Sequence, residues 1–453
     1  MSDRLRGLDR TRLQSFVQRE TARFIAAHPR SAAASSAARG FYAGVPMHWM
    51  LDWPSPFPLA VAEARGAMLR TVDGDQLDDF CLGDTGSMFG HSPAPVLRAL
   101  ERQAARGFTY MLPTEDAYAV GHLLQARFGL PHWQVATTAS DANRFALRLA
   151  RAVTGRKRVL VINGCYHGAV DETYVELHDG KARNRPGLIG QATDLTELTR
   201  VVEFNDLGGL EAALADQSVA VVMAEPVMTN CCMVLPDPGY HDALREITRR
   251  TGTLLLIDET HTISTGWGGY TQAFCLEPDM FVVGKPIAGG TPASVWGFTD
   301  AIAARWDEIR RTKSSGHSGL GTTLSANALA MALMRTALEE VMTEVAYAHM
   351  ETLAARLSDG LSAVITQHHL PWHVVRVGAR VEFVCAPGPL RNGSEAADAH
   401  CPPIEAAIHL GLVNRGCLIA PFHNMMLVCP ATQAVQVDRL VDAFGAVLSD
   451  LVS

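Results

Sequence analysis

The sequence predicts an α/β fold with a large domain, built on a mostly parallel sheet flanked by helices, and a smaller α+β domain. Several short runs are apolar throughout, including Val159–Ile162 and Val219–Met223, as is typical of strands buried on both faces. Helical patterns lie between these runs, so βαβ units are expected to follow one another. The length of 453 residues also exceeds one typical domain. We therefore expect a large domain over 76–330 and a small domain formed by 331–453 with the N-terminal segment 1–75.

The N-terminal segment contributes a helix, expected over residues 11–30, and then a stretch at 41–58 that is rich in aromatic residues and proline. Its prolines exclude a regular helix. Within this stretch Met47, Trp49 and Trp53 either line the mouth of a pocket or simply pack. The sequence does not decide between these interpretations.

A β-hairpin is predicted over residues 67–80, because the chain alternates into a turn at Asp73-Gly74 and out again. The large domain follows. Its first strand is expected at 135–139 and leads into a helix, since apolar residues recur with helical spacing from 142 to 153. Ser140 stands where this helix begins. A helix that starts directly after a strand presents backbone N–H groups to a bound anion.

Further strands are expected at 159–162, 219–223, 254–257, 281–283 and 294–298, with a polar loop at 180–195. Towards the C-terminus the pattern becomes α+β. It predicts one long helix at 326–358, strands within 374–384 and at 418–420, a helix near 403–410 and a final helix after Gln436.

Two apolar runs near the middle of the chain end in chemically active side chains. Asp258 follows Leu254–Ile257, and Lys285 comes two residues after Phe281–Val283. Ligands of open parallel sheets bind beyond the carboxyl ends of the strands, so neighbouring strands would bring this acid and amine into one pocket. Pyridoxal 5′-phosphate (PLP) needs such a pair, a lysine for the Schiff base and a carboxylate at the pyridine nitrogen.

With its IDE sequence followed by a GK and a glycine pair, the segment 254–290 resembles the class III (fold-type I) PLP-dependent aminotransferases. The resemblance is to the branch near glutamate-1-semialdehyde aminomutases and ω-transaminases, and it runs from about Phe57 to the C-terminus. It implies PLP as cofactor, Lys285 and Asp258 as catalytic residues, and a homodimer with shared active sites. The cofactor-binding residues that it implies are Ala139, Ser140, Tyr166, Glu225, Asp258, His261, Lys285 and Thr323.

The resemblance gives most of these residues a role. Ala139 and Ser140, in TASDA, would hold the phosphate, and Tyr166 would stack on the pyridine ring. Glu225 matches the glutamate of the family's VEP motif. Thr323 would reach the phosphate of the neighbouring subunit.

Two positions beside Asp258 differ from the family pattern. His261 stands where relatives have a glutamine near the phenolic oxygen of the cofactor, and is expected to make the same hydrogen bond. Thr260 replaces the usual valine. Glu259 should face away from the site and is interpreted as structural. No metal is expected, because His167 lacks a second ligand at binding spacing.

Few residues of the sequence bear on substrate recognition. Glutamate-1-semialdehyde aminomutases and similar β-amino acid transaminases carry an arginine in the loop aligned with residues 46–53. Here that loop reads PMHWMLDW, and the late loop 420–424 lacks arginine too, which counts against the aminomutase interpretation. Asn230 stands where dual-substrate transaminases carry an acid. Arg376, Arg380 and Arg415 remain candidates for a carboxylate anchor or structural charges. The aromatic residues favour an amine or a β- or ω-amino acid with an apolar body.

The first hypothesis is therefore a transaminase that passes an amino group from such a donor to a small keto acid or aldehyde acceptor. The alternative is an aminomutase or racemase on the same scaffold, and a non-catalytic dimeric scaffold is a third possibility. The net charge of −8 is spread along the chain, so nucleic-acid and membrane partners are not expected. Nine cysteines without a CxxC pair indicate reduced thiols and a cytoplasmic protein.

Overall fold

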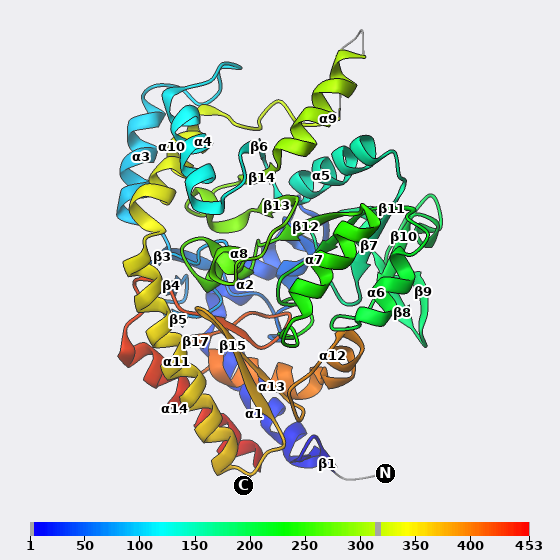
Figure 1. Ribbon diagram of the computed structural model, residues 1–453. Helices are drawn as coiled ribbons and strands as arrows, with labels where there is room; N and C mark the ends of the chain where they lie inside the picture. The colour runs from blue at the N-terminus through cyan, green and yellow to red at the C-terminus, as the bar shows by residue number, and fades with distance from the viewer. Residues whose placement is uncertain (1–3, 313–318, 453) are drawn as a thin grey trace. The chain divides into compact units, whose positions relative to one another are not determined.

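The computed structural model describes residues 4–312 and 319–452 (Figure 1). Its chain divides into two compact units. One unit comprises Ala94–Glu344 and Leu390–Asp398; the other comprises Met1–Pro93, Val345–Pro389 and Ala399–Ser453. Both are discontinuous in sequence. The expected domain boundaries at 75/76 and 330/331 stay a prediction.

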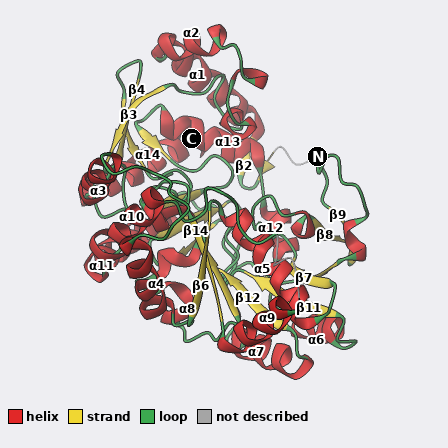
Figure 2. Ribbon diagram, turned by 90° about the horizontal axis from the view of Figure 1, so that it is seen from above, coloured by secondary structure: helices red, strands yellow, loops and turns green. Residues whose placement is uncertain are grey.

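The larger unit is built on a seven-stranded sheet with the order β10-β7-β11-β12-β13-β14-β6. Figure 2 draws strands of this sheet, among them β14, β6 and β12, in yellow. Its first five strands run parallel, and the antiparallel β14 lies between β13 and β6. The sheet is thus mostly parallel, as expected. In sheet order the strands are Thr199–Val202, Arg158–Ile162, Val219–Ala224, Leu254–Asp258, Met280–Val283, Ser294–Phe298 and His132–Ala136.

The helices of this unit cover the sheet and carry its connections. Helix α5 packs along β14, β11 and β13, while α7 contacts β12. The bounds are α3 Ala94–Ala104, α4 Glu115–Phe128, α5 Ala139–Thr154, α6 Leu207–Leu214, α7 Tyr240–Thr251, α8 Gly269–Ala273, α9 Asp300–Arg311, α10 Ala328–Thr336 and α12 Gly393–Ala399.

The prediction of a polar loop at 180–195 is wrong in part. Strands β8 (Val175–His178) and β9 (Lys181–Asn184) form an antiparallel hairpin there. Three of the four residues of β9 are exposed, so the strand has no apolar face that a sequence pattern would reveal.

The prediction of a single helix over 326–358 is also wrong. Helix α10 passes into a π-helical turn at Ala337–Val341 and ends there, and α11 (Glu344–Gln367) begins anew. The guanidinium of buried Arg127, on α4, donates to the carbonyl oxygens of Leu338 (2.6 Å) and Met342 (3.1 Å). These bonds satisfy carbonyls that the broken helix leaves without an intrahelical partner.

The other unit contains three small sheets, of two, three and four strands, and a group of helices. The predicted hairpin is present as β4 (Met68–Thr71) and β5 (Gln76–Asp79), with β3 (Val61–Arg65) added on the other side of β4. The remaining elements are β1 Arg4–Leu5, β2 Leu8–Asp9, α1 Arg10–Ala27, α2 Pro29–Ala37, β15 His373–Val377, β16 Arg380–Val384, α13 Pro402–Val413, β17 Cys417–Leu418, β18 Met425–Leu427 and α14 Ala434–Val452.

Helices α1, α13 and α14 contact one another, and β17 pairs with β5. Within the described residues, no helix is both long and apolar enough to cross a lipid bilayer.

Candidate active site

The acid and the amine singled out in the sequence lie at the same edge of the large sheet. Asp258 is the last residue of β12 and pairs in register with Val282 of the parallel neighbour β13. Lys285 follows two residues after the end of β13. Because both strands run in the same direction, their carboxyl ends open on one side of the sheet, where ligands of such folds bind.

Four hydrogen bonds surround the carboxylate of Asp258, which is 4% exposed. Its Oδ2 accepts from the amide of Asn143 and from Nδ1 of His167, each at 2.9 Å. Its Oδ1 accepts from the backbone N–H of Thr260 at 3.1 Å and from the hydroxyl of the same residue at 2.6 Å. Burial alone would raise the pKa of Asp258, but bonds from His167, Thr260 and Asn143 together lower it. The carboxylate is therefore held in its ionised form.

His167 is the charged partner of this carboxylate. Burial opposes a charge on its imidazole, but the neighbouring Cys165 and the carboxylate of Asp258 raise the pKa of His167 well above its usual range. The pair is enclosed, since His167 is 2% exposed. Among the described residues, no group of three His, Cys, Asp or Glu side chains is arranged to hold a metal ion.

Lys285 is half-buried and its Nζ lies 2.8 Å from Nε2 of His261. The lysine has a φ of +49°, in the left-handed region that side chains other than glycine rarely occupy. Local strain of this kind persists where the surrounding structure enforces it, and it is concentrated at functional sites. His261 is thus placed to orient the amine of Lys285.

The start of helix α5 forms a cradle suited to an anion. Thr138 caps the helix by accepting from the N–H of Asp141, and helix geometry leaves the first N–H groups, those of Ala139 and Ser140, without partners in the helix. The Oγ of Ser140 accepts from the N–H of Ala169 at 3.0 Å, so its own proton is free to be donated elsewhere.

Two glycines make this cradle possible. A Cβ on Gly168, whose φ is +83°, would lie 2.1 Å from the Oγ of Ser140. A Cβ on Gly284 would lie 2.9 Å from the Cβ of Ala139. A glycine at position 139 would let the backbone of the cradle come close to a ligand. Here the space beside Ala139 is left by Gly284, which lies opposite it.

Tyr166 and Glu225 follow strands β7 and β11 on the same sheet. Tyr166 is 45% exposed, and an aromatic side chain with such exposure suits stacking on a flat ligand. Glu225 is buried and accepts from Thr229 and Asn230. Burial raises the pKa of Glu225. The carboxyl group of Glu225 is therefore hydrogen-bonded to side chains of the segment that follows it, Thr229 and Asn230.

Glu259 points away from this cluster, as expected from its strand position. Its carboxylate accepts from the hydroxyl of Thr262 at 2.8 Å and from the backbone N–H groups of Tyr270 and Thr271 on α8. Burial raises the pKa of Glu259. The residue holds helix α8 against the end of β12.

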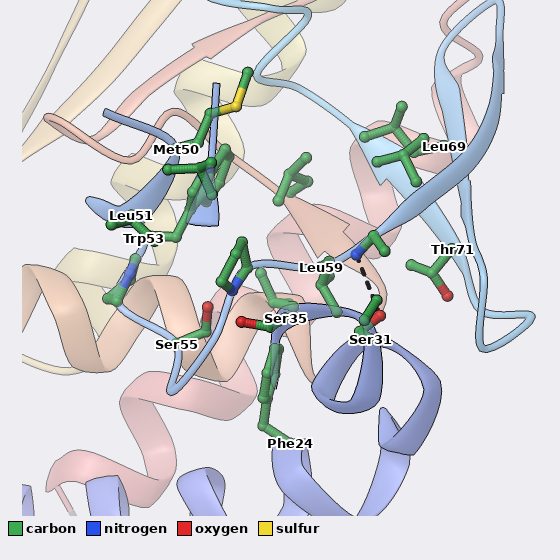
Figure 3. Close-up of a pocket in the computed structure, with 18 of the residues that line it drawn as sticks. Phe24, Ser31, Ser35, Met50, Leu51, Trp53, Ser55, Leu59, Leu69 and Thr71 are labelled. Atoms are coloured by element: carbon green, nitrogen blue, oxygen red, sulfur yellow. Dashed lines mark hydrogen bonds between the residues drawn. The ribbon is translucent and has the colours of Figure 1, made fainter. Parts of the chain in front are cut away.

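The three candidate substrate residues, Met47, Trp49 and Trp53, belong to the other unit. Met47 and Trp49 are 47% and 40% exposed, whereas Trp53 lines an apolar cavity of about 450 Å³ (Figure 3). Phe24, Met50 and Leu59 line the same cavity. A role of Met47, Trp49 and Trp53 in substrate binding stays a prediction.

Thr323 lies in an exposed turn that precedes α10. Its neighbour Thr322 lies 3.5 Å from the hydroxyl of Thr137, just before the anion cradle. Of the glycine- and serine-rich segment 314–324 that contains Thr323, residues 314–318 lie outside the described residues. The reach of Thr323 to a second subunit stays a prediction.

The arginines considered as carboxylate anchors all make internal contacts. Buried Arg380 donates to the hydroxyl of Thr85, and Arg376 donates to the carbonyl of Gly378. Arg415 pairs with Glu20 and Asp450. These contacts favour the interpretation as structural charges.

Three residues of the cluster were not foreseen in their present roles: Asn143, His167 and Thr260. Asn143 lies one helical turn after Ser140, so it shares a face with the cradle, a signal that helical periodicity could have supplied. His167 was considered only as a metal ligand. Thr260 was noted as a departure without a function.

The residues present fit PLP. A carboxylate held ionised suits a protonated pyridine nitrogen, a half-buried lysine suits the carbonyl carbon, and the helix start with its serine suits a phosphate. Asn143 and His167 fix the carboxylate, so the donor set would be in place before the cofactor binds.

Comparison with known proteins agrees with this interpretation of the site. Residues 51–448 match the family model for class-III aminotransferases. A glutamate-1-semialdehyde 2,1-aminomutase of Gemmatimonas aurantiaca is 30% identical over 87% of this chain and 90% of the relative. The crystal structure of a glutamate-1-semialdehyde aminomutase from Pseudomonas aeruginosa PAO1 is similar with a TM-score of 0.96 and 50% identity, covering 98% and 100% of the two chains.

An ω-transaminase from Sphaerobacter thermophilus is also similar, with a TM-score of 0.84 and 26% identity over 93% of this chain and 97% of the other. The match to the family model spans most of the sequence and includes every element that forms the cluster around Asp258 and Lys285. The chain therefore belongs to the class III aminotransferases and is a PLP-dependent enzyme of fold type I.

Proposed function

We propose that this enzyme is an aminomutase that moves an amino group between adjacent carbons of one small molecule, with glutamate-1-semialdehyde as the first substrate to test. The observation that carries the amino-transfer chemistry is the placement of Lys285 and Asp258 at the ends of neighbouring parallel strands. Support for the aminomutase reaction comes from the names of the relatives, including the Pseudomonas aeruginosa protein at 50% identity. The comparisons thus favour the alternative hypothesis over the transaminase.

When bound, PLP supplies an electrophilic carbon for the substrate amine and an electron-withdrawing ring. Lys285 would hold the cofactor, and its amine would then move a proton to and from the substrate carbon. Its amine is kept in place by His261 at 2.8 Å. A crystal structure of the Pseudomonas aeruginosa protein with a lysine replaced by alanine contains PMP, which supports a lysine in this role.

Asp258 keeps the proton on the pyridine nitrogen, since its lowered pKa leaves it ionised at neutral pH. Ser140 and the N–H groups of Ala139 and Ser140 bind the phosphate, and Tyr166 stacks on the ring. Glu225 borders the cofactor site. The homodimer, in which Thr323 reaches the phosphate of the neighbouring subunit, and a cytoplasmic location belong to the same proposal.

A transaminase acting on an amine or a β- or ω-amino acid is the second candidate. The absence of arginine from residues 46–53 and from 420–424 favours it, because an arginine–carboxylate pair is among the stronger polar contacts available to an acidic substrate. An amine donor, which has no carboxylate, would not need that contact.

Dependence on an amino acceptor separates the two reactions. The holoenzyme is given glutamate-1-semialdehyde alone, and the amino-shifted isomer is measured over many turnovers. In parallel, amine and amino acid donors are given with and without pyruvate or 2-oxoglutarate. Sustained isomerisation without acceptor supports the aminomutase. Turnover that stops after one equivalent, and resumes when keto acid is added, contradicts it and supports the transaminase.

A further inference from the structure

Thr260 gives Asp258 a hydrogen bond that the valine usual at this position in the family could not make. Its hydroxyl lies 2.6 Å from Oδ1 of Asp258, and its backbone N–H reaches the same oxygen at 3.1 Å. With Asn143 and His167 on Oδ2, each carboxylate oxygen accepts two donors. A carboxylate offers about four acceptor positions, so these four donors fill them.

Three of the four donors are fixed by other constraints. The amide of Asn143 also donates to the carbonyl of His167 at 3.0 Å, which holds its plane. The imidazole of His167 is enclosed, and the N–H of Thr260 belongs to the backbone at the end of β12. The hydroxyl proton of Thr260 turns about a single bond. Among the donors described around Asp258, it is the one that can be withdrawn without moving the chain.

The pyridine nitrogen of the cofactor needs one acceptor position on Asp258. We propose that Thr260 is a positioning residue whose hydroxyl satisfies Oδ1 of Asp258 in the empty enzyme and yields that position to the ring nitrogen, thereby setting how tightly the cofactor is held. This inference rests on the proposed role of Asp258. The hydroxyl stabilises the empty enzyme more than the loaded one, and so acts against cofactor binding.

Removing the hydroxyl should therefore strengthen cofactor binding. Thr260→Val keeps the shape of the side chain and leaves Oδ1 of the buried carboxylate one donor short in the empty enzyme. Hydrogen bonds to charged groups are among the stronger ones in proteins, so the dissociation constant for PLP should fall about tenfold. An ordinary structural role predicts the opposite sign, because a looser carboxylate would hold the cofactor less well.

The test is a titration of the apoenzyme with PLP, followed by absorbance, together with the Tm of the apo and loaded forms. For Thr260→Val we expect a lower apo Tm, a larger rise in Tm on loading and the tighter dissociation constant. Thr260→Ala lacks the hydroxyl too and should change affinity in the same direction if the valine variant does not fold. Thr260→Ser keeps the hydroxyl and should bind PLP as the wild type does.

Thr262→Val is the matched control. Its hydroxyl also donates to a buried carboxylate, that of Glu259 at 2.8 Å, but on the side that faces α8. This variant should lower the Tm of both forms alike and leave PLP affinity unchanged. Weaker or unchanged affinity in both Thr260→Val and Thr260→Ala would overturn the inference. If the wild-type apoenzyme itself failed to bind PLP, the proposed function would fall instead.

Discussion

Replacing Gly168 by alanine tests the geometry of the anion cradle most directly. The added Cβ would lie 2.1 Å from the Oγ of Ser140, against about 3.4 Å for an ordinary contact, so Ser140 must move by roughly 1.3 Å (3.4 − 2.1). The hydrogen bond from the N–H of Ala169 to that oxygen would be lost with the movement. The backbone at +83° adds a penalty of about 1–2 kcal/mol for any residue with a Cβ.

Gly155→Ala supplies the matched control. Gly155 ends the same helix with a φ of +69°, and a Cβ there would meet no atom within 4 Å. It should therefore show the backbone penalty alone. Overpacking costs about 1–3 kcal/mol and a lost neutral hydrogen bond about 0.5–1.5 kcal/mol, so Gly168→Ala should be less stable than the control by about 2–4 kcal/mol.

Both variants are compared by denaturant unfolding of the apoenzyme and by PLP titration. Because the serine proposed to bind the phosphate is displaced, Gly168→Ala should also lose PLP affinity by about tenfold or more, whereas Gly155→Ala should keep it. Equal stability and equal affinity of the two variants would refute the assignment of this glycine to the cradle.

Three further predictions concern other parts of the larger unit. Lys285→Ala should remove the visible absorbance of lysine-bound PLP while leaving the apo Tm within about 2 °C of wild type; a variant that kept the band would contradict the role of this lysine. Arg127→Met should lower the free energy of unfolding by about 2–4 kcal/mol, since two carbonyls at the helix break lose their donor, whereas Arg98→Met, at an exposed pair, should change it little. The pKa of His167 is raised in the folded protein, so its contribution to stability should be complete below about pH 6.5 and decline as the pH rises through the folded-state pKa. The difference in Tm between wild type and His167→Gln, measured against pH, should therefore shrink in alkaline solution. A difference that grows with pH would refute the pairing of His167 with Asp258.

The strands of the large sheet were predictable because a strand that is buried on both faces appears in the sequence as a continuous run of apolar residues. Ser294–Phe298 was expected and found with the same bounds, and all five of its residues are buried. The direction of that strand was not predictable from its composition. Its antiparallel pairing depends on the path of the chain between Lys285 and Ser294.

Exposed strands, and a helix end that is capped by a residue far away in the sequence, could not be predicted from a local pattern. Strand β3 has four exposed residues among its five, so no alternation marked it. The break at Met342 depends on Arg127, which lies 215 residues earlier in the chain. A local pattern cannot contain that information.

The candidate site divides in the same way. Asp258 and Lys285 could be proposed because each stands at the end of an apolar strand or within two residues of it. Asn143 and His167 meet Asp258 from 115 and 91 residues away. Their convergence follows from strand order, which the sequence specifies only through the complete fold.

The position of β6 at the edge of the sheet has a consequence for synthesis on the ribosome. This strand is made first among the seven, yet among the described strands it pairs with β14 alone, which begins 158 residues later (294 − 136). Closing so long a loop has an entropic cost that no local contact offsets, so the edge waits until residue 298 has emerged. Helix α5 leaves directly from β6, and the anion cradle therefore gains its final support late in translation, after Asp258 and Lys285 have already been made.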